Sequence, residues 1–268
     1  MGQKQHSVSS VQTIERAAAI LRCFNEDHPE LGVTDISQRT KLHKSTVSRM
    51  LLALKKEAFV TQNPQTGKWH LGFGLLNLAG VILEQMDLRS LAKAHLLDLA
   101  EITQETINIS ILDGNECVNV ECITSPKPIQ YAGRLGRRVP LHCTSTGKVL
   151  LAFLSAEQRF AMMPGKLHPY TKDTPVDRSS LETTLNQIRT AGYAIAHEEF
   201  QEGLSAIAAP IRDHNGYVIA TVSVSGPTFR MGPGRIEQFV EPLLNTAARI
   251  SADLGFVSSG KEVLRKDL

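Results

Sequence analysis

Residues 33–54 read VTDISQRTKLHKSTVSRMLLAL, and their apolar positions decide how the first part of the chain folds. These positions recur at the spacing of two short helices that cross over a shared core, with the polar segment KLHK in the turn. They are Val33, Ile36, Leu42, Val47, Leu51 and Leu54. The stretch therefore predicts a helix-turn-helix, in which Thr34 caps the first helix and the second begins near Lys44 or Ser45.

The outward face of the second helix is basic and carries hydroxyl groups. Because a helix repeats about every 3.6 residues, an inward-facing Val47 and Leu51 leave the opposite side chains outside. Arginine can donate two hydrogen bonds to a guanine edge, serine can bond base edges or phosphates, and lysine can lie over phosphate oxygens. The face therefore predicts entry into a DNA major groove; the alternative is an amphipathic helix that meets only solvent. We expect DNA contacts from Lys44, Ser45, Ser48, Arg49, Lys55 and Lys56.

The flanking segments predict a winged helix. Upstream, an apolar stripe at helical spacing indicates a scaffold helix; its residues are Val11, Ile14, Ala18, Leu21 and Phe24. Downstream, residues 59–61 and 68–71 flank the segment NPQTG at 63–67, which is typical of two strands joined by a turn. We expect this wing to bring Gln65, Thr66 and Lys68 to the DNA backbone or an adjacent groove, where they position the protein and do not specify sequence.

The composition is that of a globular protein with a localised basic charge. The 268 residues suffice for two domains, and 42% are hydrophobic and 21% charged. No apolar run approaches the roughly 20 residues of a membrane-spanning helix, and the chain does not start like a secretory signal, so we expect a cytoplasmic protein without a membrane partner. Residues 1–72 hold 10 Lys and Arg against 6 Asp and Glu, a net +4, whereas the remainder holds 19 against 21, a net −2. The basic excess belongs to the predicted DNA-binding part.

The chain beyond the wing predicts a linker helix, a second domain and a tail. We place the boundaries at 1–72, 73–87, 88–258 and 259–268. The linker carries a stripe that is too apolar to stay exposed: Leu75, Leu78, Ile82 and Met86. It packs either on its own chain or on a second copy. We favour the second copy, because two copies would read two DNA half-sites and double the contacts.

The second domain alternates helices with pairs of strands. A helix from residue 88 to about 105 precedes a predicted hairpin of 108–112 and 118–122, and residues 206–211 and 218–225 predict another. Further helices are expected at 147–154, 157–163, 179–191 and 235–254. Strand pairs separated by helices are typical of an α+β fold with an antiparallel sheet.

A small-molecule site is predicted at the start of helix 147–154. Thr144, Ser145 and Thr146 precede this helix, so its free amides would bind a carboxylate or phosphate without a buried basic side chain. Ser223 and Ser225 share one face of their strand, where their hydroxyls could bond the same ligand. The alternative is that residues 144–146 only cap the helix and the two serines bond each other.

Catalytic patterns are incomplete. Gly147-Lys148 lacks the Ser or Thr and the upstream Gly of a phosphate loop, and residues 203–207 lack the final Gly of a nucleophile elbow. The cluster of one His and two Glu at 197–199 is more typical of a solvated surface. We expect neither an enzyme nor a cofactor; the alternatives are a small-molecule enzyme or a ligand sensor that acts through protein contacts.

The cysteines predict free thiols. Cys23, Cys117, Cys122 and Cys143 contain no CxxC pair, and no export signal suggests disulfides. A metal site from the last three of them and His142 is the alternative, but its spacing matches no zinc pattern, so we expect no metal.

Four blocks of the first domain, in this order, resemble the amino-terminal domain of IclR-type bacterial transcription regulators. They are VQTIERA at 11–17, TDIS at 34–37, KSTVSRML at 44–51 and GKWHLG at 67–72. The resemblance implies that Lys44 to Arg49, Thr46 included, open the recognition helix, and that Arg16 lies near the phosphate backbone.

The second domain is similar to the effector-binding domain of the same family, a fold related to GAF and PAS sensor domains. The matching blocks lie at 133–138, 140–148, 192–193, 198–199, 203, 207–210 and 223–227, so the resemblance spans about residues 10–257. It implies dimers or tetramers, and effector contacts from Ser145, Thr146, Ser223 and Ser225.

Two departures from the family pattern concern the pocket. Ala196 and Ala206 stand where many relatives carry Asp and Cys, so a roomier pocket is expected. The expected effector site comprises Ser145, Thr146, Gly147, Ala196, Ala206, Ser223 and Ser225. Together these features predict a homo-oligomeric, ligand-responsive repressor of a catabolic operon, with double-stranded operator DNA as partner and a sugar, keto or aromatic acid as effector.

Overall fold

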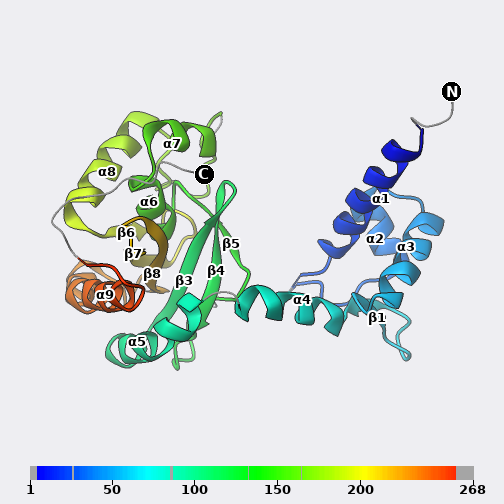
Figure 1. Cartoon of the computed structure of the whole chain (residues 1–268), viewed down its shortest axis with the longest axis horizontal. Helices are drawn as coiled ribbons and strands as arrows, with labels where there is room; N and C mark the ends of the chain where they lie inside the picture. Colours follow the sequence, from blue (N-terminus) through cyan, green and yellow to red (C-terminus); the bar gives the residue numbers. More distant parts are fainter. Residues whose placement is uncertain (1–4, 26, 85–86, 132, 164, 258–268) are drawn as a thin grey trace. The chain divides into compact units, whose positions relative to one another are not determined.

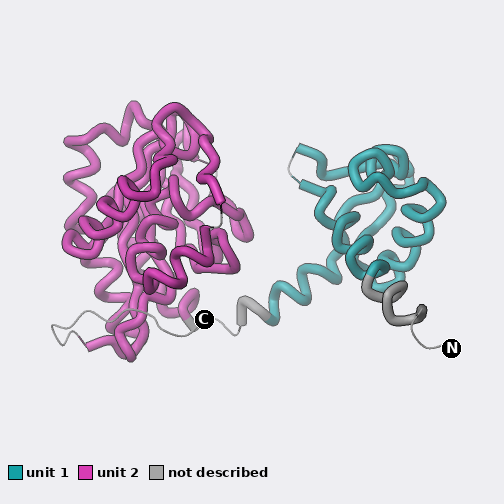
Figure 2. Tube along the Cα trace, turned by 90° about the horizontal axis from the view of Figure 1, so that it is seen from above, with its two compact units in different colours: residues 1–85 teal, residues 86–268 magenta. Residues whose placement is uncertain are grey.

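The computed structural model describes residues 5–25, 27–84, 87–131, 133–163 and 165–257. The chain divides into two compact units, residues 1–85 and 86–268 (Figure 2). The predicted tail at 259–268 lies outside the described residues. None of the described helices is both long enough and apolar enough to cross a membrane.

The first unit is a winged helix, as the sequence predicts (Figure 1). Helices α1 (Gln5–Leu21), α2 (Val33–Thr40) and α3 (Lys44–Lys56) precede strands β1 (Val60–Gln62) and β2 (Trp69–Leu71). The strands pair antiparallel, with Val60 opposite Leu71, and Leu31 adds a bridge to Trp69. One core joins the helices and the hairpin; its buried members are Ile20, Phe24, Leu31, Ile36, Val47, Leu51, Leu54, Val60 and Trp69.

The inward face of α1 differs from the predicted stripe. Ile14 is 71% exposed, whereas Ile20 is fully buried. The α1 residues that reach the core are Ala17, Ile20 and Leu21, all in its last turns, so the expected contribution of Ile14 is wrong. The side chain of Val11 lies outside the described residues.

The cap of α2 also differs from the prediction. Gly32 is the capping residue, and its N–H donates to the Asp35 carboxylate at 3.0 Å. Thr34 already belongs to the first turn, so it is not the cap. A carboxylate in the first turn is favourable because the helix dipole places positive charge there.

Helix α4 (Phe73–Glu84) follows the wing with a single residue, Gly72, in between. A Cβ atom on Gly72 would overlap the carbonyl oxygen of Ala58, so glycine is what lets the helix start this close to the turn after α3. The N–H groups of Gly72 and Gly74 donate to the carbonyl oxygens of Phe59 and Ala58, each at 2.9 Å. The start of α4 is therefore fixed to the winged helix.

Large apolar side chains of α4 are exposed. Leu75 of the predicted stripe is half-buried and Leu78 is exposed, while the Ile82 side chain and Met86 lie outside the described residues. Phe73, Leu76 and Val81 are exposed as well, Phe73 to 83% and Leu76 to 62%.

The second unit is built on a six-stranded antiparallel sheet, in the order β5-β4-β3-β8-β7-β6. Its elements are α5 (Asp87–Thr103), β3 (Thr106–Asp113), β4 (Glu116–Ile123), β5 (Arg138–Pro140), α6 (Ser145–Ala152), α7 (Ala156–Met162), α8 (Arg178–Ala191), β6 (Ala194–His197), β7 (Leu204–Arg212), β8 (Val218–Pro227) and α9 (Pro233–Asp253). The hairpins β3–β4 and β7–β8 and the α+β class are confirmed. The short edge strands β5 and β6 were not expected from the sequence.

Helices cover both faces of this sheet. Helices α5 and α9, which lie side by side in Figure 1, pack on the face that carries Ile107, Ile207 and Val222. Helix α6 packs on the other face, which carries Ala208, and α8 packs on α6. Because successive strand residues point to opposite faces, Asn108 and Ser223 share the face with Ala208.

Candidate functional site

Helix α3 turns one continuous face to the outside of the first unit. Ser45, Arg49, Leu52 and Lys56 recur at helical spacing, opposite the buried Val47, and all four are exposed. Of the residues predicted to contact DNA from this helix, Lys44, Ser45, Arg49, Lys55 and Lys56 are exposed and Thr46 and Ser48 are half-buried. The helix begins at Lys44, as expected.

His43, which the sequence reasoning missed, caps α3. Its Nδ1 accepts the N–H of Ser45 at 3.3 Å and lies 2.8 Å from the Ser45 hydroxyl. Arg49 Nε donates to the carbonyl oxygen of Ser45 at 3.4 Å. These contacts hold Ser45 and Arg49 on one side of the helix. Histidine is not among the preferred capping residues, so its capping role could not be predicted from residue type.

The wing tip is held by its own hydrogen bonds. The side-chain oxygen of Asn63 accepts the N–H groups of Gln65 at 2.9 Å and Thr66 at 3.3 Å. The Glu30 carboxylate accepts from Asn63 Nδ2 at 2.9 Å and from the Thr66 hydroxyl at 3.4 Å. Gln65, Thr66 and Lys68 are exposed on this ordered loop.

Two further basic residues that the sequence predicts to contact DNA, Lys55 and Arg16, are less free to reach it. Lys55 Nζ is 6.0 Å from the centre of the Trp69 ring, a cation–π contact that links α3 to β2. Arg16 is half-buried on α1. Ser45, Arg49 and Lys56 remain exposed on the outward face of α3.

A pocket lies on the α6 side of the sheet in the second unit. Its floor consists of cross-strand neighbours, because Asn108 pairs with Ser223, Ser225 with Ala206, and Ala206 with Ala196. Its empty volume is about 480 Å³, open mouth included. It is lined by Asn108, Asn119, Tyr131, Val139, Cys143, Thr144, Ser145, Thr146, Ala196, Glu199, Phe200, Leu204, Ala206, Ser223 and Ser225. Six of the seven residues that the sequence predicts for the effector site lie in this lining; the exception is Gly147.

The start of α6 supplies hydrogen-bond donors to this pocket. Ser145 and Thr146 occupy the first turn, where N–H groups have no partner within the helix. The Gly147 N–H instead donates to the Thr144 hydroxyl at 3.1 Å. A Cβ on Gly147 would overlap the backbone of Leu141, so this glycine allows α6 to pack closely and is not part of the lining.

A buried ion pair adjoins the pocket, contrary to the expectation that no basic side chain would be buried there. Lys148 Nζ donates to Glu199 Oε1 at 2.5 Å and to the carbonyl oxygen of Ile195 at 2.7 Å, and only 4% of the Lys148 side chain is exposed. Glu199 lines the pocket, and its Oε2 is buried without a hydrogen-bond partner. Lys148 is therefore paired within the protein, through a carboxylate that lines the pocket.

The other members of the 197–199 cluster bond elsewhere. His197 Nδ1 lies 2.9 Å from the Ser205 hydroxyl, and the Glu198 carboxylate accepts the Gly203 N–H at 3.1 Å. The three side chains therefore do not converge on one reacting atom.

Amides and hydroxyls continue the polar lining across the sheet. Asn119 Nδ2 donates to Asn108 Oδ1 at 3.3 Å, and the Ser110 hydroxyl donates to Asn119 Oδ1 at 2.8 Å. Neither asparagine was predicted from the sequence, although the alternation of Ile107, Asn108 and Ile109 already places Asn108 on the face opposite the isoleucines.

Tyr131 reaches the pocket from segment 125–131, which is fastened to the end of the sheet. The Thr106 hydroxyl donates to the carbonyl oxygen of Tyr131 at 2.8 Å. The Ser125 N–H donates to the same Thr106 hydroxyl at 3.2 Å, and the Ser125 hydroxyl donates to the carbonyl oxygen of Gln104 at 2.8 Å.

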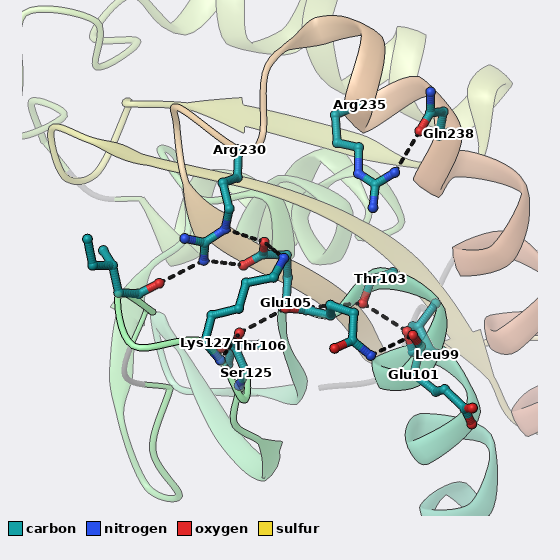
Figure 3. Close-up of polar contacts among 12 residues, drawn as sticks. Leu99, Glu101, Thr103, Glu105, Thr106, Ser125, Lys127, Arg230, Arg235 and Gln238 are labelled. Atoms are coloured by element: carbon teal, nitrogen blue, oxygen red, sulfur yellow. Dashed lines mark hydrogen bonds and ion pairs between the residues drawn. The ribbon is translucent and has the colours of Figure 1, made fainter.

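The Glu105 carboxylate holds the same segment through two cations (Figure 3). It accepts from Arg230 Nε at 2.6 Å, Arg230 Nη2 at 2.8 Å and Lys127 Nζ at 2.9 Å. Arg230 Nη2 also donates to the carbonyl oxygen of Ile129 at 2.7 Å. Burial tends to raise the pKa of the Glu105 carboxyl, but the hydrogen bonds and charges of Arg230 and Lys127 outweigh it and hold that pKa below its usual value.

The cysteines are free thiols. Burial raises the pKa of Cys117 and of Cys143, which lines the pocket, to about 12 in each case. Both thiols therefore stay protonated and unreactive near neutral pH. The described residues contain no cluster of three or more potential metal ligands from His, Cys, Asp and Glu.

Comparison with known proteins gives family matches for both units. Residues 13–64 match the IclR helix-turn-helix domain, and residues 80–252 match the C-terminal domain of bacterial transcriptional regulators of the IclR type. The chain is 36% identical to the HTH-type transcriptional regulator XynR of Escherichia coli over 92% of this chain and 98% of that protein. It is 34% identical to the HTH-type transcriptional repressor AllR of Klebsiella pneumoniae over 95% and 94%.

A solved structure shares the fold over most of the chain. An IclR homolog from Microbacterium hydrocarbonoxydans, crystallised with 4-hydroxybenzoate, superposes with a TM-score of 0.80 at 28% identity, covering 90% of this chain and 98% of that one.

Proposed function

This chain belongs to the IclR family of DNA-binding transcription regulators, and we propose that it is a repressor whose operator binding responds to a small organic acid. The observation that carries the proposal is the exposed face of α3, on which Ser45, Arg49 and Lys56 stand over a packed core. The similarity to the repressor AllR supports the sign of regulation. A repressor of a catabolic operon would bind its operator less tightly, or in a different geometry, when the acid that the operon consumes accumulates.

DNA binding through α3 is tested by comparing two cations of the same face. Arg49→Ala should weaken binding to a selected operator by about 1–3 kcal/mol and relax specificity at one base pair, because guanidinium groups read guanine edges. Lys56→Ala should weaken binding to all sequences to a similar degree, because lysine neutralises phosphates. Titrations on operator and random duplexes distinguish these effects.

Equal losses on operator and random DNA for both variants would contradict the assignment. Charge reversal at Lys44 and Arg49 provides a second test of DNA binding. If Lys44→Glu with Arg49→Glu leaves DNA affinity unchanged, regulation runs through protein contacts, as in the alternative ligand-sensor hypothesis.

The proposed effector site is the pocket beside α6. A carboxylate would accept from the first-turn N–H groups of Ser145 and Thr146, and the Ser223 and Ser225 hydroxyls would bond its remaining polar groups. Val139, Phe200 and Leu204 add apolar groups to the lining, which suits a carbon skeleton or ring. The homolog crystallised with 4-hydroxybenzoate supports a small acid as ligand. In a thermal-shift screen of such acids, those that bind the folded state should raise the melting temperature of the protein.

We further propose that two copies pair through α4. The exposed apolar surface of α4 includes Leu78 of the predicted stripe together with Phe73, Leu76 and Val81, and it costs free energy while it faces water. Pairing two copies would bury this surface and present two recognition helices to successive half-sites of one duplex.

A further inference from the structure

Leu52 is an apolar side chain in the middle of a polar surface. It lies three residues after Arg49 and four before Lys56 on the outward face of α3, and it is 52% exposed. The helix buries Val47, Leu51 and Leu54 on the other side, so Leu52 contributes nothing to the core of this unit. An exposed leucine by itself needs no explanation, but one flanked by the cations of a DNA-reading face does.

The major groove offers one apolar group that matches Leu52. Each base pair presents hydrogen-bond donors and acceptors there, and thymine alone adds a methyl group, at C5. Contact between that methyl and a leucine removes both from water, whereas a leucine over a guanine or adenine edge would desolvate polar atoms without bonding them.

The spacing along the helix sets where that thymine would lie. Ser45 and Leu52 are seven residues apart on one face, which corresponds to roughly 10 Å along the helix axis. Base pairs stack at about 3.4 Å, so the span covers about three steps of the duplex. Leu52 would therefore face a base pair within about three steps of the one beneath Ser45, with Arg49 between them.

We propose that Leu52 is a specificity-determining residue that reads a thymine methyl in each half-site of the operator. This inference rests on the proposed role of α3 as the recognition helix. It adds a preference for thymine that the hydrogen-bonding side chains of the face do not supply.

The test uses the full-length protein and removes single methyl groups from DNA. An operator is selected from random duplexes with the wild-type protein, and each thymine is replaced in turn by deoxyuridine, which lacks only the methyl. We expect one position per half-site at which the replacement weakens binding by about four-fold, the value of one buried methyl-sized group. In Leu52→Ala, thymine and deoxyuridine at that position should bind equally, and Leu52→Met, which keeps an apolar tip, should restore part of the difference.

Leu97 provides a matched control, because it is also 52% exposed but lies on α5 of the other unit. Leu97→Ala should keep the full thymine preference. The proposal is overturned if no thymine responds in the wild-type protein, if the preference survives in Leu52→Ala, or if Leu97→Ala abolishes it equally. It also fails if Leu52→Ala changes the oligomeric state, since Leu52 would then meet a second copy. If α3 is not the recognition helix, Arg49→Ala will bind the operator with wild-type affinity and specificity. That result distinguishes failure of the α3 assignment from failure of the Leu52 proposal.

Discussion

Glu105 shows at the residue scale how a side chain outside the pocket can shape it. Its carboxylate is 2% exposed and is surrounded by donors from Arg230 and Lys127. Arg230 in turn holds the backbone of segment 125–131, which ends in the pocket residue Tyr131. A buried charge is tolerated only when it is paired and hydrogen-bonded, and here its partners fix that segment in place.

Glu105→Gln should destabilise the second unit by about 1–3 kcal/mol at pH 7, because it removes the charge from a buried, hydrogen-bonded pair. The folded pKa of Glu105 is lowered, so its stabilising contribution is complete above its unfolded pKa of about 4.3 and is lost as pH falls through the lower folded value. Urea midpoints measured from pH 7 to pH 3 should therefore converge for wild type and variant at the acid end.

The pair between Arg159 and Glu182 is the control. Its Glu182 side chain is 45% exposed, so Glu182→Gln should cost less than about 1 kcal/mol. A difference between wild type and Glu105→Gln that persists unchanged at pH 3 would show that charge is not the cause.

Single residues were predictable from the sequence where a pattern repeats, and less so where a contact is made at long range. Ser145, Ser223 and Ser225 were found from a helix start and from strand alternation, and they share one pocket. Lys148 and Glu199 are 51 positions apart in the chain, and the sequence around each of them does not indicate that they form a pair. The periodicity of apolar residues within one helix or strand cannot predict a contact between residues so far apart in the chain.

At the scale of elements, the start of α6 combines two tasks. Thr144 caps the helix and Gly147 lets it approach the backbone of Leu141, and Ser145 and Thr146 of the first turn line the pocket. Sequence periodicity located α6 within two residues at each end, since its apolar run is continuous. The edge strands β5 and β6 escaped prediction because three or four residues are too few to display alternation.

Removing two hydroxyls from this pocket tests its role. Ser145→Ala combined with Ser223→Ala should leave operator affinity within about two-fold, because both residues lie in the other unit from α3, and should abolish the response to acids found in the thermal-shift screen. Band-shift titrations with and without the acid measure both effects. A response that survives in the double variant would move the effector site elsewhere.

For the molecule as a whole, the proposed pairing of two copies depends on the exposed apolar side chains of α4. Leu76→Glu should shift the protein from dimer to monomer in sedimentation, because a charge at the centre of an apolar contact is not solvated there. Operator affinity should fall by more than ten-fold, since a monomer reads one half-site. The control is Leu135→Glu, at a comparably exposed leucine of the second unit. A dimer that persists in Leu76→Glu would place the contact on another surface.

The joint at Gly72 has a mechanical consequence. Because the N–H groups of Gly72 and Gly74 are bonded to the turn after α3, the start of α4 and the winged helix are expected to rotate together. A rotation of α4 would then reorient the recognition helix α3 without unfolding any part of the winged helix.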